Sequence, residues 1–445
     1  MADFGRRGFL SGLSSGIALG FGATLSAGGC ADRTERQSPV AVRHPLVGQK
    51  FPPWKPGEFQ VHFIYTGVAE SMFWILPDGT TMLLDCGDHP AWRRGKLALW
   101  VLPSGCKYAG EWIARYVTRV NPNKDEVDYM MLSHHHGDHG GMDDWGAGKP
   151  IEWKGRRIWR SGFMLAAETL RFRRGFDRGW PGFDDPVPDR QGDDACLPHM
   201  QKVIAYLQER DGLKMEPFRV GAVNQVAMLR NPAAYPEFGI TNITGNGKIL
   251  CRDGSVKDLF AGHHGFKGWI NENAMSLGLM VQYGPFRFYS AGDFAEKMKL
   301  PDGRVISFED SIAPELDPVD VAKMNHHGCY SMSKSIVSAL RARVWTACVW
   351  DKIHLAEPTL ERLSDRSIYP GPRLIAPGVF TPSKRIEMTG RSFLDDIAPE
   401  SFEAGHVVLT VAPGGRSYSV AYVTADDESM KVTGAYDFTS RGAVA

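Results

Sequence analysis

A nine-residue segment, Ser133–Gly141, places four potential metal ligands within six positions: His134, His136, Asp138 and His139. It follows an apolar run, Tyr-Met-Met-Leu, and ends in a pair of glycines. Neutral imidazoles and a carboxylate crowded together suit a borderline-soft divalent cation. The His-x-His-x-Asp-His spacing is specific enough to favour a metal site over a solvated polar turn. The chain therefore needs a fold in which a strand ends at a metal centre.

The spacing within the motif separates the four ligands into two pairs. At the end of a strand, residues i and i+2 point the same way, so His134 and His136 can share one metal. Asp138 and His139 follow in the turn and can reach a second metal. Two ions about 3.5–4 Å apart can hold a bridging hydroxide and clamp the oxygens of a displacement reaction. We expect Asp138 to be catalytic as well as a ligand, by orienting the nucleophile or accepting its proton.

Three further segments, in the order in which they occur, resemble those of the metallo-β-lactamase-fold hydrolases. They end in Asp85-Cys86-Gly87, Gly292-Asp293 and His326-His327-Gly328, and the resemblance covers roughly residues 58–350. It implies an α/β fold, a four-layer αβ/βα sandwich with two mixed sheets face to face. It also implies that Asp85 orients a metal-binding histidine and that Asp293 bridges two metals. Of the paired histidines we expect His326 to be the last ligand, with His327 beside the site.

Within that superfamily the chain is most similar to the hydrolase domain of the DNA-uptake protein ComEC and its soluble relatives. The similarity lies in Asn271–Leu277, Gly292-Asp293 and Lys323-Met-Asn-His-His-Gly. Many superfamily members have a third histidine for the metal held at the positions of His134 and His136, in the region of Asn271–Leu277. This chain offers Asn271, Asn273 or Ser276 there, and His263-His264 upstream. The expected cofactor is one or two Zn ions, with Mn or Fe as alternatives and Asn273 close to the site.

The amino terminus resembles a twin-arginine export signal. It carries Arg6-Arg7 followed by Phe9-Leu10, and no Asp or Glu occurs between Phe9 and Cys30. We expect a signal peptide over residues 1–31, a linker over 32–57 and an enzyme outside the cytoplasm, in the periplasm. Ala27-Gly28-Gly29-Cys30 resembles a lipoprotein cleavage site, so a lipid anchor at Cys30 is the alternative to ordinary cleavage. We expect no transmembrane span in the mature protein.

The remaining chain is expected to contain a hydrolase domain over 58–365, with an insertion at about 145–270, and a β-rich extension over 366–445. We interpret that extension as a small β appendage packed on the core. The 51 basic and 51 acidic residues give a formal net charge of zero. There is thus no overall basic field to attract nucleic acid, which disfavours a nucleic-acid substrate without excluding it.

These observations predict a metal-dependent hydrolase that cleaves an ester or phosphodiester bond through a metal-bound hydroxide. A small molecule or a phosphodiester is the expected substrate. A β-lactam or lactone hydrolase is one alternative. A mononuclear iron oxidoreductase on the same scaffold is another, because the pair His134 and His136 lacks an obvious third histidine. Lys323 is expected to be solvated.

Overall fold

The computed structural model describes residues 44–89, 101–184, 196–261, 271–300 and 303–443. The expected signal peptide, with Arg6, Arg7 and Cys30, and the first part of the expected linker lie outside these residues, as do His263 and His264. Helices and strands both occur along the whole described chain. The mixed α/β class expected from the sequence is confirmed.

The first large sheet combines strands from both ends of the chain. Within the described residues it has nine strands, in the order β21 (Val432–Thr439), β20 (Ser417–Thr424), β19 (Gly405–Val411), β1 (Phe59–Phe63), β2 (Ser71–Ile75), β3 (Thr81–Cys86), β4 (Glu126–Leu132), β7 (Arg171–Asp177) and β8 (Lys214–Pro217). The strands from β21 to β3 pair antiparallel. Those from β3 to β8 pair parallel.

The second large sheet is also mixed. In the same described ranges it has eight strands, in the order β11 (Val256–Asp258), β10 (Lys248–Leu250), β9 (Phe238–Gly245), β12 (Gly278–Tyr283), β13 (Phe286–Ser290), β16 (Val321–Lys323), β17 (Val344–Ala347) and β18 (Leu374–Pro377). β13, β16, β17 and β18 run parallel. Two short hairpins lie outside the large sheets, formed by β5 (Ile151–Trp153) with β6 (Arg156–Ile158) and by β14 (Lys297–Lys299) with β15 (Val305–Ser307).

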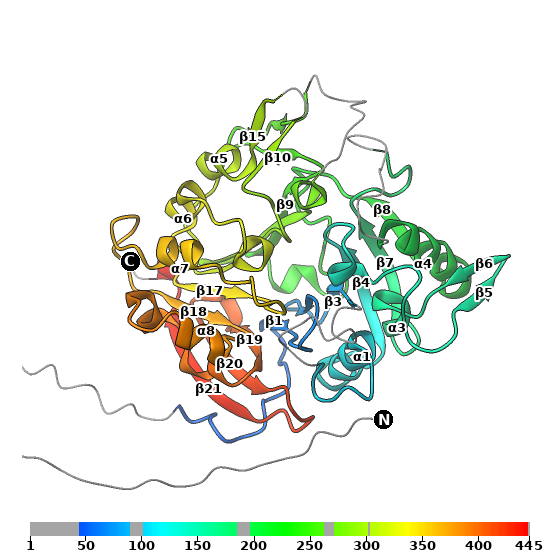
Figure 1. The fold of residues 1–445 in the computed structure, drawn as a ribbon, viewed down its shortest axis with the longest axis horizontal. Helices are drawn as coiled ribbons and strands as arrows, with labels where there is room; N and C mark the ends of the chain where they lie inside the picture. The colour runs from blue at the N-terminus through cyan, green and yellow to red at the C-terminus, as the bar shows by residue number, and fades with distance from the viewer. Residues whose placement is uncertain (1–43, 90–100, 185–195, 262–270, 301–302, 444–445) are drawn as a thin grey trace, which may run out of the picture. The chain divides into compact units, whose positions relative to one another are not determined.

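Helices cover the outer faces of both sheets. Those assigned along the described chain are α1 (Ala109–Val120), α2 (Gly137–Gly140), α3 (Gly162–Ala166), α4 (Cys196–Asp211), α5 (Phe308–Ile312), α6 (Lys334–Leu340), α7 (Glu357–Ser364) and α8 (Pro382–Glu387). Figure 1 shows α1, α3 and α4 gathered beside the first sheet, and α5, α6 and α7 beside the second. No helix within the described ranges combines the length and the apolar character needed to cross a membrane.

The layers follow from the alternation of side chains along each strand. In β2, Met72 and Trp74 belong to the apolar core between the two sheets, which also contains Phe288 of β13. Phe73 and Ile75 point the other way, into the core beneath α1, α3 and α4. A third core joins the second sheet to α5, α6 and α7. Both sheets are therefore buried on two faces, which produces the helix–sheet–sheet–helix arrangement expected from the sequence.

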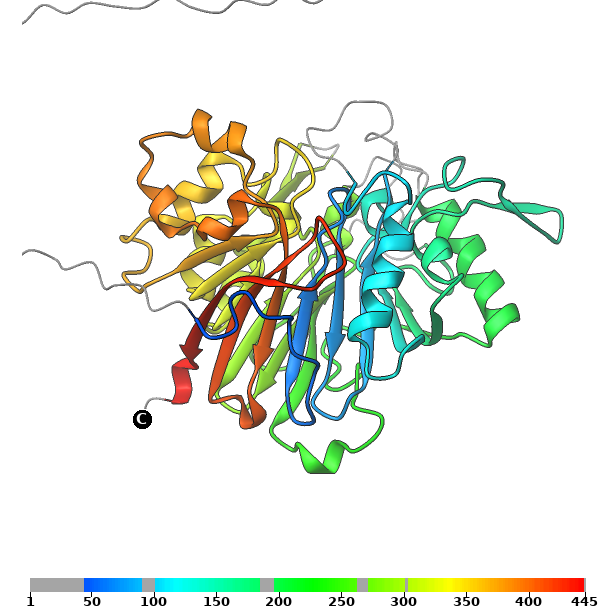
Figure 2. The same ribbon diagram turned by 90° about the horizontal axis from the view of Figure 1, so that it is seen from below.

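The C-terminal strands differ from the small appendage expected from the sequence. β19 pairs along its length with β1, from Phe59 opposite Val411 to Phe63 opposite Val407, so β19, β20 and β21 continue the first sheet. Figure 2 shows these orange and red strands beside the blue strands β1 and β2. Likewise, the stretch 145–270 supplies β7 and β8 to the first sheet and β9, β10 and β11 to the second. Because the paired strands are so distant in sequence, neither strand's own sequence pattern indicates its partner.

Candidate metal centre

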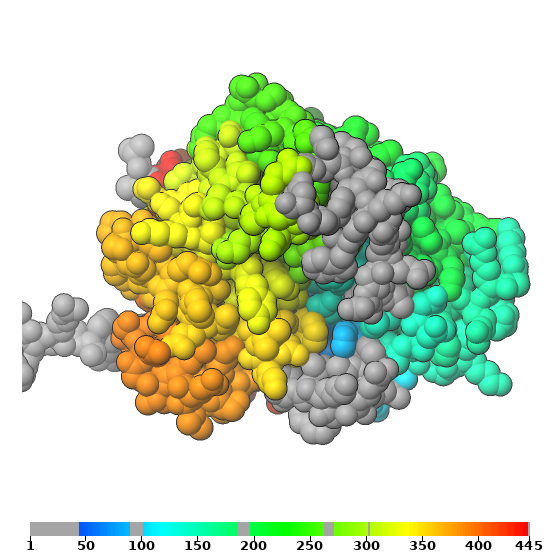
Figure 3. Space-filling model, turned by 45° about the horizontal axis from the view of Figure 1, so that its top comes forward, coloured from blue at the N-terminus to red at the C-terminus, as the bar shows by residue number. Residues whose placement is uncertain are grey.

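The ends of parallel strands from both sheets supply the candidate site. Asp85 lies at the end of β3, and the motif begins directly after β4. In the second sheet, Asp293 follows β13, and His326 and His327 follow β16. Parallel strands carry their carboxyl ends to one edge of a sheet. In Figure 3 the yellow segments of the second sheet border blue and teal segments of the first near the centre of the view.

The motif turn lies unusually close to the backbone after β3. The Glu70 amide donates to the Asp138 carbonyl at 2.8 Å, and the Asp88 amide donates to the Gly137 carbonyl at 2.9 Å. A Cβ on Gly87 would lie 1.7 Å from that Asp138 oxygen. Glycine at position 87 therefore allows α2, and the Asp138 side chain with it, to approach the first sheet.

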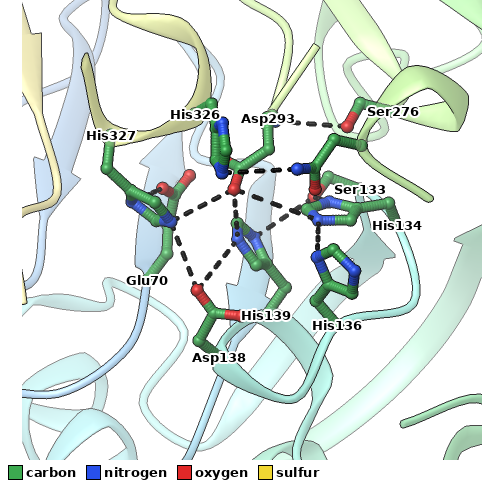
Figure 4. Close-up of polar contacts among 12 residues, drawn as sticks. Glu70, Ser133, His134, His136, Asp138, His139, Ser276, Asp293, His326 and His327 are labelled. Atoms are coloured by element: carbon green, nitrogen blue, oxygen red, sulfur yellow. Dashed lines mark hydrogen bonds and ion pairs between the residues drawn. The ribbon is translucent and has the colours of Figure 1, made fainter. Parts of the chain in front are cut away.

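Four side chains converge on one point, as Figure 4 shows: Asp138, His139, Asp293 and His327. His139 Nε2 lies 3.2 Å from Asp293 Oδ2 and 3.5 Å from Asp138 Oδ2. His327 Nε2 lies 3.1 Å from Asp293 Oδ2 and 3.2 Å from Asp138 Oδ2. Ligand distances of about 2.0 Å around a tetrahedral zinc place neighbouring ligand atoms about 3.3 Å apart. The separations thus match those of atoms arranged around one small divalent cation.

Hydrogen bonds behind two of the motif histidines leave their Nε2 atoms free to bind a metal. His139 Nδ1 donates to Asp85 Oδ2 at 2.8 Å. His134 Nδ1 lies 3.0 Å from Ser133 Oγ, and that hydroxyl donates to Asp85 Oδ2 at 2.7 Å. A proton held at Nδ1 leaves a lone pair on Nε2, which is how ligand histidines are oriented in metal sites. Asp85 is completely buried, and the structure places it where the sequence analysis expected an orienting carboxylate.

His327 is oriented in the same way by the second sheet. Its Nδ1 donates to the Cys348 carbonyl at 2.8 Å and lies 3.2 Å from Glu70 Oε2. The ring also stacks on His354 with centroids 4.3 Å apart. Sequence analysis gave no role to Glu70, although a single carboxylate between two apolar strands is a signal that could have singled it out. His354 is itself buried in this contact.

Lys323 is completely buried, in contrast to the solvated position expected from the sequence. Its ammonium lies 3.1 Å from Glu70 Oε1 and 3.7 Å from Asp293 Oδ1, and it donates to the Gly292 carbonyl at 2.7 Å. Burial alone would raise the pKa of Glu70, but the lysine holds that pKa below its usual value. Lys323 thus supplies a fixed positive charge behind the carboxylates of the centre.

The paired histidines after β16 take up different positions from those expected. His327, rather than His326, faces Asp138 and Asp293, whereas His326 Nε2 lies 3.3 Å from Asn273 Nδ2. Both histidines have left-handed backbone angles, with φ of 47° and 53°. Non-glycine residues in that region are strained and persist where surrounding structure holds them. This reversal of the backbone, which no sequence pattern reveals, decides which ring enters the centre.

The electrostatic balance of the centre calls for a cation. Burial alone would lower the pKa of His139, but the Asp293 and Asp138 carboxylates raise that pKa well above its usual range. Asp293 raises the pKa of buried His327 in the same way. Burial would raise the pKa values of both carboxyls, but the histidines hold them well below their usual range. Without a metal, protons on the two imidazoles thus balance the negative charge of the two carboxylates. A bound metal ion would displace these protons and balance the same charge.

Glu70, His139, Asp293 and His327 are buried, each offers one ligand atom, and these atoms lie within 4.8 Å of one another, so the group could hold a metal ion. Glu70 also faces Lys323 and His327 Nδ1. Asp138 Oδ2, outside this group, lies 3.5 Å from His139 Nε2 and 3.2 Å from His327 Nε2.

The other histidine pair of the motif lies beside this centre. His134 Nε2 is 3.0 Å from His136 Nδ1 and 4.0 Å from Asp293 Oδ2. Asp293 Oδ2 therefore approaches His134 of this pair as well as His139 and His327 of the centre. Burial lowers the pKa of His134 well below its usual value, so this imidazole is neutral and able to bind a cation.

His135, the remaining histidine of the motif, points away from the centre into a buried ion network. Its Nε2 lies 3.0 Å from Asp177 Oδ2, and its Nδ1 lies 3.3 Å from Glu272 Oε1. Burial opposes protonation, but Asp177 raises the pKa of His135 to about 9. Glu272 also accepts from Arg178 Nη2 at 2.6 Å. This network joins the motif turn to β7 and to the segment that precedes β12.

Comparisons with known proteins leave the family open: no protein-family model matches the chain, and no curated protein shows significant similarity to it.

Proposed function

We propose that the protein is a metal-dependent hydrolase of the metallo-β-lactamase type that cleaves ester or phosphodiester bonds. The observation that carries the proposal is the convergence of His139 Nε2, His327 Nε2 and two carboxylates at 3.1–3.5 Å. Both imidazoles are held by hydrogen bonds at Nδ1. A cluster of ion pairs with only a structural role would not need both imidazole rings to direct the lone pairs of their Nε2 atoms at the same point.

The residues of the centre have distinct roles in this proposal. His139, His327, Asp293 and Asp138 would hold one ion, and His134 with His136 would hold a second beside Asp293. We favour zinc, for which imidazole and carboxylate ligands are suited, with Mn or Fe as alternatives. When bound, such an ion lowers the pKa of a coordinated water to about 7 and polarises the bond to be cleaved.

Asp138 is the residue we propose as catalytic. Its side chain is 12% exposed, whereas that of His139 is 0% and that of Asp293 is 2% exposed. It is thus the carboxylate of the centre that substrate and water can most easily reach. Its Oδ2 would be placed to orient the attacking water and to accept its proton as a general base.

We further propose that the enzyme acts outside the cytoplasm, after export directed by Arg6-Arg7. Anchoring at Cys30 is the alternative to release by cleavage. A small ester or phosphodiester is the proposed substrate. The formal net charge of zero gives no support to a nucleic acid.

Metal analysis and a substrate panel test the proposed function together. Protein purified without chelator should contain one or two divalent ions per chain. It should hydrolyse bis-p-nitrophenyl phosphate faster than a chromogenic cephalosporin or a lactone. Chelation and Asp138→Ala should each abolish turnover, and zinc should restore it only to the chelated native protein.

Two outcomes would contradict this proposal. Full activity of Asp138→Ala on the best substrate would exclude the role assigned to that carboxylate. One iron per chain after anaerobic purification, without hydrolysis of any substrate in the panel, would favour an iron oxidoreductase instead. Preferential cleavage of the cephalosporin or the lactone would move the substrate class to cyclic amides or esters while leaving the metal centre in place.

A further inference from the structure

The buried amide of Asn273 is hydrogen-bonded on one side only. Asn273 lies in a 3₁₀ turn, η3 (Glu272–Met275), directly before β12, and is 7% exposed. Its Nδ2 lies 3.3 Å from His326 Nε2. Its Oδ1 is buried and has no hydrogen-bond partner among the described residues. A buried carbonyl without a hydrogen-bond partner destabilises the fold, so an atom of this kind calls for a partner such as a cation.

Several contacts fix η3 against the motif turn. The His135 amide, between the two ligand histidines, donates to Glu272 Oε1 at 2.8 Å. Farther along, the Leu277 amide donates to the Ser133 carbonyl at 2.9 Å. The Asp293 amide donates to Ser276 Oγ at 3.1 Å. Asn273 is thus held between residues bonded to the motif turn on one side and to Asp293 on the other.

Within the residues that the structure describes, His134 and His136 belong to no group of three or more His, Cys, Asp or Glu side chains that could hold an ion. His134 Nε2 and His136 Nδ1 lie 3.0 Å apart, close to the separation of about 3.3 Å between neighbouring ligands of a tetrahedral ion. Asp293 Oδ2, at 4.0 Å from His134 Nε2, can be shared with the neighbouring centre. An additional neutral oxygen would complete a set that binds a divalent cation without adding charge.

We propose that Asn273 Oδ1 is the third protein ligand of a second metal ion held by His134 Nε2 and His136 Nδ1, with Asp293 shared between the two ions. His326 is then a positioning residue: its Nε2 accepts from Asn273 Nδ2 and keeps the amide oxygen directed at the ion. This inference rests on the proposed function, because it adds a second ion to the same centre.

The amide oxygen of Asn273, in place of a third imidazole, determines the order in which the two metal ions bind. Amide oxygen is a harder and weaker ligand for zinc than imidazole, and it suits Mn²⁺ better. The ion at His139 and His327 therefore binds first, and the ion at His134 and His136 binds second and more weakly. The difference in affinity between Zn²⁺ and Mn²⁺ is expected to be smaller for the ion at His134 and His136 than for the ion at His139 and His327.

Titration of metal-free protein with Zn²⁺ and with Mn²⁺ tests the assignment. Calorimetry measures the affinity of each ion, and elemental analysis after desalting measures the number of ions bound. The native protein should take up two ions. Asn273→Ala should bind the first ion as the native protein does and the second at least tenfold more weakly. Asn273→Asp, which keeps the shape and adds a charge, should bind the second ion more tightly than the native protein. Asn123→Ala, at the opposite end of β4, serves as the matched control.

The role of His326 has its own readout. His326→Ala should weaken the second ion alone, and His326→Gln, which retains an acceptor for the Asn273 amide, should recover most of that loss. With Mn²⁺, the electron paramagnetic resonance signal of a coupled ion pair should be present in the native protein. In Asn273→Ala at the same metal concentration, the signal of a single ion should replace it.

Three results distinguish the failure of this inference from that of the proposed function. Uptake of one ion at saturating metal, or a second ion unaffected by Asn273→Ala, would overturn the inference and leave the hydrolase proposal intact. Loss of the second ion in a His263→Ala, His264→Ala double variant, with Asn273→Ala unaffected, would assign the ligand to those histidines. Failure to bind any ion would remove the proposed function itself.

Discussion

Glu70 Oε2 lies 3.2 Å from Nδ1 of His327, while Nε2 of the same ring lies 3.1 Å from Asp293. The first sheet therefore supports, through Glu70, a histidine that belongs to the second sheet. In the proposed metal site, such a support would affect metal binding by orienting the histidine.

Glu70→Gln is expected to weaken binding of the first metal about 10–100-fold, the usual range for residues that support a ligand histidine. The amide keeps the shape of the side chain but loses the charge that faces His327 and Lys323. Competition with a chromophoric chelator would measure the change. Glu361→Gln, on the exposed face of α7, should leave the affinity unchanged. Native affinity in Glu70→Gln would assign the orientation of His327 to the Cys348 carbonyl alone.

Lys323→Met is expected to destabilise the metal-free protein by about 3–5 kcal/mol, because it leaves buried carboxylates without their counter-charge. Both Lys323 and Glu70 are completely buried, so solvent cannot replace the lost partner. Urea denaturation would measure the loss. The double variant Lys323→Met, Glu70→Gln should recover part of it, since it removes one of the uncompensated charges. Equal stability of the single variant and the native protein would show that Lys323 is not needed to balance Glu70.

Gly87→Ala is expected to abolish metal binding at the first position, even if the sheets still form. Its Cβ would lie 1.7 Å from the Asp138 carbonyl oxygen, so the motif turn must move away from the first sheet. Elemental analysis and circular dichroism of the purified variant would separate loss of metal from loss of fold. At Gly371 the nearest atom to an added Cβ is 3.9 Å away, so Gly371→Ala is the matched control. Native metal content in Gly87→Ala would mean that the turn can shift without loss of the site.

The stability of the metal-free protein is expected to fall as the pH decreases from 6.5 to 4. His199 is buried, donates to the Ser161 carbonyl at 3.2 Å, and burial lowers its pKa to about 4. Above the unfolded-state pKa of about 6.5 the residue is neutral in both states, and its contribution to stability is complete. Below that value only the unfolded chain takes up the proton, which costs the folded state about 3 kcal/mol by pH 4.

His199→Gln tests this linkage, because glutamine can still donate to the carbonyl but does not titrate. The difference in unfolding free energy between the native protein and His199→Gln should shrink by about 1.4 kcal/mol for each pH unit below 6.5. His62 and His406, whose pKa values burial lowers to about 3, act in the same direction in both proteins. A difference independent of pH would show that His199 does not titrate between the two states.

The parts of the centre that are contiguous in sequence could be predicted. The positions of His134, His136, Asp138 and His139 follow from the spacing of one turn after an apolar strand. The role of Glu70 could not be predicted, because it depends on a contact with His327, a residue more than 250 positions away. The choice between His326 and His327 depends on two left-handed backbone conformations that are stabilised by tertiary packing and have no local sequence signature.

The same limit applied to the sheets. The sequence predicted a β-rich segment over residues 366–445, and β19, β20 and β21 lie within it. Their partner was not visible, since an exposed β1 edge and a separate C-terminal hairpin would have the same local pattern. The pairing of Val61 with Leu409 is a property of the completed fold.

The pairing of β1 with β19 also bears on when the protein can fold. β1 ends at Phe63, whereas its partner begins at Gly405, so more than 300 residues must be synthesised between them. The nascent chain therefore leaves the ribosome with β1 at an open sheet edge, and loop closure over this distance slows completion of the sheet. Open strand edges favour pairing with other chains. We expect newly made protein to depend on a chaperone during this interval, and a chain that stops before Gly405 to aggregate rather than accumulate as a soluble fragment.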